Sequence, residues 1–168
     1  MLELKGIEIT FPGPPRYTAV KSVDMTLEAG ETVGLVGESG SGKSSIAKAI
    51  VGLNPIVAGS ITLDNKTMAS ATRKRLQRTR ESVQLVFQDP HASLNPRMTV
   101  GDTLGEALTI GNHERGYARD ELMKLLEMVG LADSYASRYP HQMSGGQLQR
   151  VAIARALAVK PRYLVFDE

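Results

Sequence analysis

The sequence predicts an α/β fold in which a mixed β-sheet with flanking helices carries an inserted all-helical subdomain. Three observations lead to this prediction. Short apolar segments with strand-like alternation fill the first half of the chain. A glycine-rich stretch joins an apolar segment to a helix-like one. Further on, leucines recur at three- and four-residue steps, which is the period of an amphipathic helix.

Composition excludes several classes of protein. The 168 residues are 42% hydrophobic and 23% charged, as in soluble globular domains. A net charge of +2 gives no reason to expect a nucleic-acid partner. The chain has no cysteine, which excludes disulfides and thiolate metal sites. No segment resembles a signal peptide or reaches the ~20 apolar residues of a membrane span, so we expect a cytoplasmic location.

The first half is expected to contain four strands and one helix. Apolar and polar residues roughly alternate in the first of these strands, and the second closes in a turn at Gly30. The third, "TVGLVG", is expected to be a buried strand. Proline and glycine separate the first strand from the second. The expected elements are the strands 2–11, 20–31 and 32–37, the helix 43–52, and the strand 59–65 with a turn at Asp64 and Asn65.

The second half is expected to be mainly helical. Its predicted elements are a basic helix 71–80, a strand 82–88, a loop 89–97, helices between 99 and 137, a helical block 143–161 and a strand 163–166. We therefore predict a single domain, 1–168, in which 1–88 and 161–168 form the α/β core and 89–160 the helical subdomain. The basic run is interpreted as a solvated helix face, because no aromatic residues interleave it; its members are Arg73, Lys74, Arg75, Arg78 and Arg80.

The clearest motif is "GESGSGKS", residues 37–44. It matches G-x-x-x-x-G-K-[ST] between an expected strand and an expected helix, which is typical of a phosphate-binding loop, or P-loop. Glycines let backbone N–H groups turn toward phosphate oxygens, and the helix N-terminus adds a partial positive charge. Lys43 is predicted to reach the β and γ phosphates, and Ser44 to bind Mg²⁺. The alternative is a Gly-Ser turn that only caps a helix.

This motif predicts a P-loop nucleotide-binding core, without distinguishing ATP from GTP. The residues predicted to bind the nucleotide here are Gly37, Glu38, Ser39, Gly40, Ser41, Gly42, Lys43, Ser44 and Ser45.

Two carboxylates follow the last apolar run, "YLVFDE". P-loop enzymes place an acid at the end of a buried strand to hold magnesium, and Asp167 fits that role. Glu168 is one residue further, where a glutamate can act as a general base on the attacking water. The alternative is that adjacent acids only begin a loop.

A third motif, "MSGGQLQRVAIARAL", resembles the signature of ATP-binding cassette (ABC) ATPases, with Met143 in place of the usual leucine. Ser144, Gly145, Gly146 and Gln147 match that signature. The P-loop, the signature and the final strand occur in the family's order, and the resemblance covers the whole chain. Ser144 and Gln147 also have the spacing of a capping box, so the motif is expected to start a helix as well.

The resemblance implies an ATPase that uses ATP and Mg²⁺. In that family two cassettes dimerise head to tail, so Ser144, Gly145, Gly146 and Gln147 would bind the ATP held by the other copy's P-loop. Gln88, in "VFQDP", stands where the family has its Q-loop glutamine. The resemblance gives it contact with magnesium and the attacking water, beside the catalytic Glu168.

An aromatic side chain is expected to stack on adenine. Phe11 ends the first strand at a distance from the P-loop that suits the family's A-loop, and Tyr17 is the alternative. Phe11 as a core residue remains equally open. The histidines, His91, His113 and His141, precede the position of the family's switch histidine and are interpreted as surface or loop residues.

The stretch "SLNPR" followed by "MTV" resembles the ATPases of bacterial peptide and nickel importers. This implies a peripheral protein at the cytoplasmic face of the inner membrane. Its partners would be an identical or related ATPase subunit, membrane permease subunits and, indirectly, an extracytoplasmic substrate-binding protein.

Family members continue beyond the strand that ends here. We therefore expect a C-terminally truncated piece that lacks the later strands, with low stability and little ATP hydrolysis alone. The alternatives are a soluble ABC ATPase that works without a transporter and a module that binds nucleotide without turnover.

Overall fold

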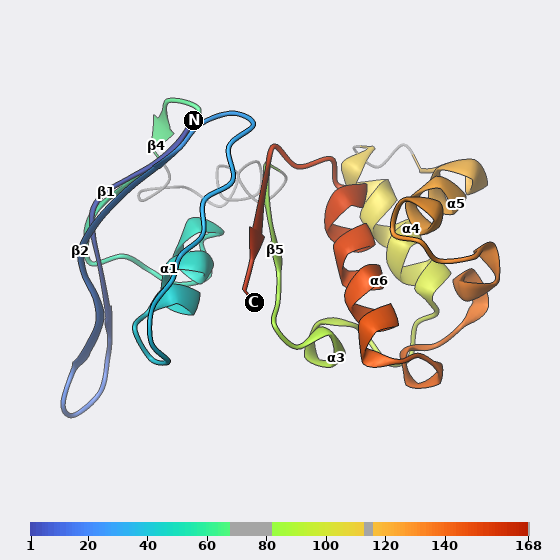
Figure 1. The fold of residues 1–168 in the computed structure, drawn as a ribbon, viewed down its shortest axis with the longest axis horizontal. Coiled ribbons are helices and arrows are strands. Elements are labelled where there is room, and N and C mark those ends of the chain that lie inside the picture. Colours follow the sequence, from blue (N-terminus) through green and yellow to red (C-terminus); the bar gives the residue numbers. More distant parts are fainter. Residues whose placement is uncertain (68–81, 113–115, 168) are drawn as a thin grey trace. The chain divides into compact units, whose positions relative to one another are not determined.

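The structure is a computed structural model that describes residues 1–67, 82–112 and 116–167. The chain folds into two compact units, Met1–Val83 and Gln84–Glu168. Figure 1 shows mainly strands in the described part of the first unit, and mainly helices in that of the second. The predicted basic helix 71–80, His113 and Glu168 lie outside the described residues. The predicted division into 1–88 with 161–168 and 89–160 stays a prediction.

The first unit is built on an antiparallel sheet in the order β2-β1-β3-β4. Its strands are β1 (Leu2–Phe11), β2 (Tyr17–Leu27), β3 (Ala58–Leu63) and β4 (Lys66–Thr67). The alternation expected in the first strand is confirmed, because its inward residues are all but inaccessible: Leu2, Leu4, Ile7 and Ile9. The turn predicted at Asp64 and Asn65 is also confirmed, with φ of 48° and 62°.

The helix α1 (Lys43–Ile50) follows the glycine-rich stretch, as predicted, and buries Ile46, Ala47, Ala49 and Ile50. The prediction for "TVGLVG" is wrong. Residues 32–37 form no strand, and Val36 is 99% exposed. A buried strand needs a hydrogen-bonded neighbour, and no strand of the described residues pairs with this segment. The apolar side chains of residues 32–37 are therefore exposed to solvent.

The second unit contains the helices expected between residues 99 and 161. They are α4 (Val100–Gly111), α5 (Arg119–Met128) and α6 (Gly145–Ala158), with the 3₁₀ turns η1 (Asp133–Ser137) and η2 (Pro140–Gln142). Leucines at helical spacing meet in one core, as their periodicity predicted: Leu104, Leu108, Leu122, Leu125 and Leu126. Leu148 of α6 joins the same core. One detail differs, because the predicted loop 89–97 contains a helical turn, α3 (Pro90–Ser93), with Asp89 as its N-cap.

Helix α6 is buried on two faces. Leu148, Val151 and Ala154 pack into the helical core, whereas Ala152 and Ala156 pack against β5 (Val83–Val86). The last strand, β6 (Tyr163–Phe166), pairs with β5, and the two run in the same direction (Figure 1). Small alanines on one face let the helix lie close to a strand while its larger residues fill the bundle. This packing holds the start of α6 and the ends of β5 and β6 in one unit.

Helix α4 begins with a complete capping box. Thr99 accepts a hydrogen bond from the backbone N–H of Asp102, and the Asp102 carboxylate accepts from the backbone N–H of Thr99. The Thr99 hydroxyl also donates to that carboxylate at 2.6 Å. These bonds, the hydroxyl's first, lower the pKa of Asp102 below its ordinary value.

Candidate functional site

The glycine-rich loop of the first unit turns sharply into α1. Gly40 and Gly42 have φ of 81° and 95°, a left-handed conformation that only glycine adopts readily. The backbone N–H of Ser41 donates to the carbonyl of Glu38 at 3.2 Å, which closes the turn. No described side chain caps α1, and its first turn holds no acidic residue. The positive end of this helix is therefore suited to an anion.

The Lys43 ammonium is folded over the same loop. It donates to the carbonyls of Gly37 at 2.8 Å and Glu38 at 2.7 Å, and to the Ser41 hydroxyl at 3.4 Å. All of these acceptors are exposed and neutral, so an anion with several oxygens would be a stronger partner for the ammonium. The loop, the helix end and Lys43 are together suited to a polyphosphate, and nucleotide binding by these residues stays a prediction.

Gly42 also fixes where the loop lies against the sheet. A Cβ at this residue would be 2.6 Å from the carbonyl oxygen of Ala19 and 2.9 Å from Cγ2 of Val20, both in β2. Phe11 and Tyr17 face each other in the β1–β2 register, two residues from Ala19 along β2. Phe11 is half-buried and Tyr17 is 58% exposed. Both candidates for adenine stacking thus lie at the hairpin end that adjoins the P-loop, and either role stays a prediction.

The close contact at Gly42 gives a testable difference between two glycines of the loop. Gly42→Ala is expected to destabilise the loop and to weaken nucleotide binding at least tenfold, because the new methyl group meets backbone of β2 as well as an unfavourable φ. Gly40→Ala is the control, since its Cβ would meet no described atom within 4 Å and only the φ penalty of about 1 kcal/mol remains. Urea unfolding and titration with a fluorescent ATP analogue measure both. Equal effects would contradict the contact.

The second unit places Gln88 and Asp167 at the ends of adjacent strands. Gln88 follows β5 by two residues, and Asp167 follows β6 directly. The backbone N–H of Asp167 donates to the carbonyl of Val86 at 3.0 Å, so the ladder extends to the acid. Since β5 and β6 are parallel in Figure 1, both residues belong to the same edge. This is the edge at which the sequence predicted a magnesium-binding acid.

The signature motif forms the N-terminus of α6. Ser144 is the N-cap: its Oγ accepts from the backbone N–H of Gln147, and Oε1 of Gln147 accepts from the backbone N–H of Ser144 at 2.9 Å. The predicted capping box is therefore confirmed. Ser144, Gly145 and Gly146 are exposed, Gln147 is half-buried, and the first turn of α6 has no acidic residue.

Two hydrogen bonds that hold this region could not be predicted from the motif. Nε2 of Gln147 donates to the hydroxyl of Tyr135 in η1 at 2.8 Å. Further along α6, Nη1 of Arg155 donates to the carbonyl of Ser93 in α3, which ties the signature helix to the segment after Gln88. Burial lowers the pKa of the Arg155 guanidinium from its ordinary value, and the charge of Glu106 opposes that effect. Tyr135 and Ser93, the two acceptors, lie outside the motif, so its spacing could not indicate them.

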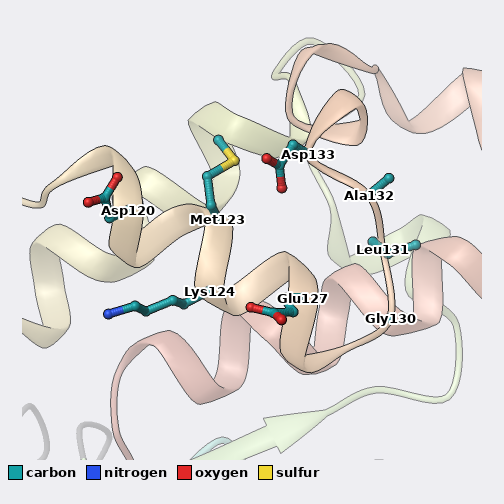
Figure 2. Close-up of a pocket in the computed structure, with 8 residues that line it drawn as sticks. All are labelled: Asp120, Met123, Lys124, Glu127, Gly130, Leu131, Ala132 and Asp133. Carbon is teal, nitrogen blue, oxygen red and sulfur yellow. The ribbon is translucent and has the colours of Figure 1, made fainter.

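A separate open hollow lies beside α5 (Figure 2). Met123 and Leu131 provide apolar lining, while Lys124 is accompanied by three acidic residues, Asp120, Glu127 and Asp133. No predicted site residue lines it. Among the described residues, no three His, Cys, Asp or Glu side chains gather as they would around a metal ion. In the same part of the chain, no helix combines the length and apolar character that crossing a bilayer requires.

Comparisons with known proteins show the family that the sequence resembles. Residues 20–168 match the family described as ABC transporter. The dipeptide transport ATP-binding protein DppF of Lactococcus lactis is 42% identical over 174 residues, which cover 100% of this chain and 56% of that protein. The oligopeptide transport ATP-binding protein OppF of Haemophilus influenzae is 43% identical over 160 residues, 94% of this chain and 48% of that protein. The chain thus spans about half the length of these curated relatives.

Solved structures show the same likeness. The dimeric, post-hydrolysis state of the ATP-binding cassette MJ0796 bound to ADP and Pi superposes with a TM-score of 0.86 at 32% identity. The match covers 99% of this chain and 73% of that one. CbiO1 from Clostridium perfringens, part of the transporter complex cbiONQ, matches with a TM-score of 0.77 at 29% identity, over 99% of this chain and 64% of that one. The expected α/β cassette fold is therefore confirmed.

Proposed function

The chain belongs to the ABC transporter family, and on that premise we propose that it is the ATP-binding and ATP-hydrolysing part of a bacterial peptide importer. The names of the curated relatives support peptides as the cargo. The nickel branch, which the sequence left open, stays a prediction that these relatives do not favour. The proposal includes a permease in the membrane, a position at its cytoplasmic face and, indirectly, an extracytoplasmic binding protein.

Each motif has a role in this proposal. Lys43 and the N-terminus of α1 bind the β and γ phosphates, and Phe11 or Tyr17 stacks on adenine. Ser44, Asp167 and Gln88 would hold Mg²⁺, whose charge neutralises that of the phosphates during transfer. The Gln88 amide orients the attacking water, and Glu168 accepts its proton, so that the water oxygen attacks the γ phosphorus and ADP leaves. These roles rest on the motif positions and on the geometry within each unit.

The proposed dimer is inferred from the glycine pair, Gly145 and Gly146, at the start of α6. Neither Gly145 nor Gly146 has a positive φ. A Cβ at either would meet no described atom within 4 Å. Glycine leaves the unfolded chain more conformational freedom than alanine does, at a cost of up to about 1 kcal/mol in a helix interior, so this pair brings α6 no benefit within the described residues. Glycine at both positions is explained if a second molecule approaches the backbone of Gly145 and Gly146 closely. Because the first turn of α6 has no acidic residue, its N-terminus favours a phosphate group as that molecule's contact.

Sedimentation of the chain with and without Mg-ATP tests this proposal. Because ATP is shared between the P-loop of one copy and the signature of the other, we expect dimers with ATP and monomers with ADP or without nucleotide. A parallel assay of phosphate release separates the ATPase from a module that only binds nucleotide. Co-purification with a membrane permease from cells separates the transporter subunit from a soluble ABC ATPase. A chain that binds ATP and stays monomeric would contradict the head-to-tail dimer.

A further inference from the structure

The side chain of Gln147 is hydrogen-bonded at both ends of its amide. Oε1 accepts from the backbone N–H of Ser144 at 2.9 Å, and Nε2 donates to the hydroxyl of Tyr135 at 2.8 Å. A glutamine amide is nearly symmetric in shape, so its orientation is chosen by its partners. If it were reversed, Nε2 would face the Ser144 N–H, and two donors would meet. The Ser144 N–H, which can only donate, therefore sets the orientation, and the Tyr135 hydroxyl accepts from the Nε2 that this orientation presents, which holds the amide at its second end.

Tyr135 is itself held in place. It lies half-buried in η1, where its backbone N–H donates to the carbonyl of Ala132 at 2.9 Å. The Arg138 guanidinium carbon is 4.1 Å from the centre of its ring, a cation–π contact that restrains the ring plane. Nearby, Nη1 of Arg150 in α6 donates to the carbonyl of Gly130 at 3.1 Å. The segment 130–138 is thus fastened to α6 at two points, and the tyrosine hydroxyl is presented to Gln147 from a fixed backbone.

We propose that Tyr135 is a positioning residue for the signature motif: its hydroxyl restrains the Gln147 amide and, through it, the Ser144 cap that faces a partner's nucleotide. With the capping box complete, Ser144 Oγ accepts from the Gln147 N–H, so its hydroxyl proton points elsewhere and can be donated to a phosphate oxygen. The exposed N–H groups of Gly145 and Gly146 are fixed in the same direction. The inference rests on the proposed head-to-tail dimer. Tyr135 lies outside the signature motif, nine positions before Ser144.

The test removes the hydroxyl oxygen of Tyr135 in the full chain. Tyr135→Phe keeps the ring over which Arg138 lies and removes only the hydroxyl. The matched control is Tyr139→Phe, because Tyr139 lies four residues away and no described hydrogen bond uses its hydroxyl. In ¹⁵N NMR spectra we expect the Gln147 side-chain amide signals to shift and to exchange faster in Tyr135→Phe, and to be unchanged in Tyr139→Phe. Gln147→Met identifies those signals.

ATP-dependent association measures the consequence. Loss of one neutral hydrogen bond that positions the site is expected to weaken the ATP dimer about fivefold in Tyr135→Phe. In the Gln147→Met background the same substitution should have no further effect, because the residue through which Tyr135 acts is gone. If Tyr135 only stabilised the fold, Tyr135→Phe would weaken the ATP dimer in that background too.

Each outcome supports or overturns the inference. Unchanged Gln147 amide signals in Tyr135→Phe overturn it, and so does a fivefold loss that persists in the Gln147→Met background. If the wild-type chain never associates with ATP, the proposed dimer fails, and the inference that rests on it falls too. The amide signals of Gln147 do not depend on nucleotide, so they show separately whether the contact itself was correct.

Discussion

Lys43→Ala is expected to abolish ATP binding at micromolar concentrations of protein, with an affinity lower by at least about 100-fold. The Lys43 ammonium lies over the P-loop, where it donates hydrogen bonds to the neutral carbonyls of Glu38 at 2.7 Å and Gly37 at 2.8 Å. Charge-assisted hydrogen bonds to phosphate contribute about 1.5–3 kcal/mol each, and two of them account for this factor. Titration with Mg-ATP by calorimetry measures the change.

The matched control is Lys48→Ala, which removes an equal charge from the last turn of the same helix. It should leave the affinity within about twofold, because exposed charge far from the ligand is screened. Lys43→Arg adds a second comparison: it keeps the charge, but the planar guanidinium does not fit the turn as the ammonium does. If Lys43→Ala bound ATP as tightly as Lys48→Ala, the motif would not be the phosphate site.

Helical features were predictable from the sequence because they depend on neighbours in the chain. The spacing of Leu122, Leu125 and Leu126 places them on one face of α5, and the structure buries all three in the helical core. The capping box of Ser144 and Gln147 is likewise a local pattern, and both of its hydrogen bonds are present. Such features need no knowledge of which segments meet.

Strand predictions failed where the outcome depends on distant partners. Residues 32–37 have the composition of a buried strand, as the residues of β6 do. β6 pairs with β5, whereas no strand of the described residues pairs with 32–37. An apolar run predicts burial only if a neighbour supplies hydrogen bonds for its backbone. The contact between Gln147 and Tyr135 could not be predicted for a related reason, since it joins two helical segments through a single hydroxyl.

Gly146→Asp is expected to have opposite effects on the stability of the second unit and on ATP-dependent association. Aspartate is only slightly better than glycine as a helix former, by a few tenths of a kcal/mol, but an acid in the first turn adds about 0.3–1 kcal/mol through the helix dipole. Helices α4 and α5 carry such acids, Asp102 in one and Asp120 and Glu121 in the other, whereas α6 has none. The new carboxylate finds open space, since a Cβ at Gly146 meets no described atom within 4 Å.

The same carboxylate would face the γ phosphate of a nucleotide held by another copy. Repulsion between two anions at the dimer interface should weaken ATP-dependent association by about 100-fold or more. Gly146→Ala is the neutral control: it should stabilise the helix and weaken association less, because a methyl group crowds the phosphate without repelling its charge. Urea unfolding and sedimentation with Mg-ATP separate the two effects. A more stable Gly146→Asp variant that still dimerises with ATP would show that α6 points at no phosphate, and the glycine pair would then need another explanation.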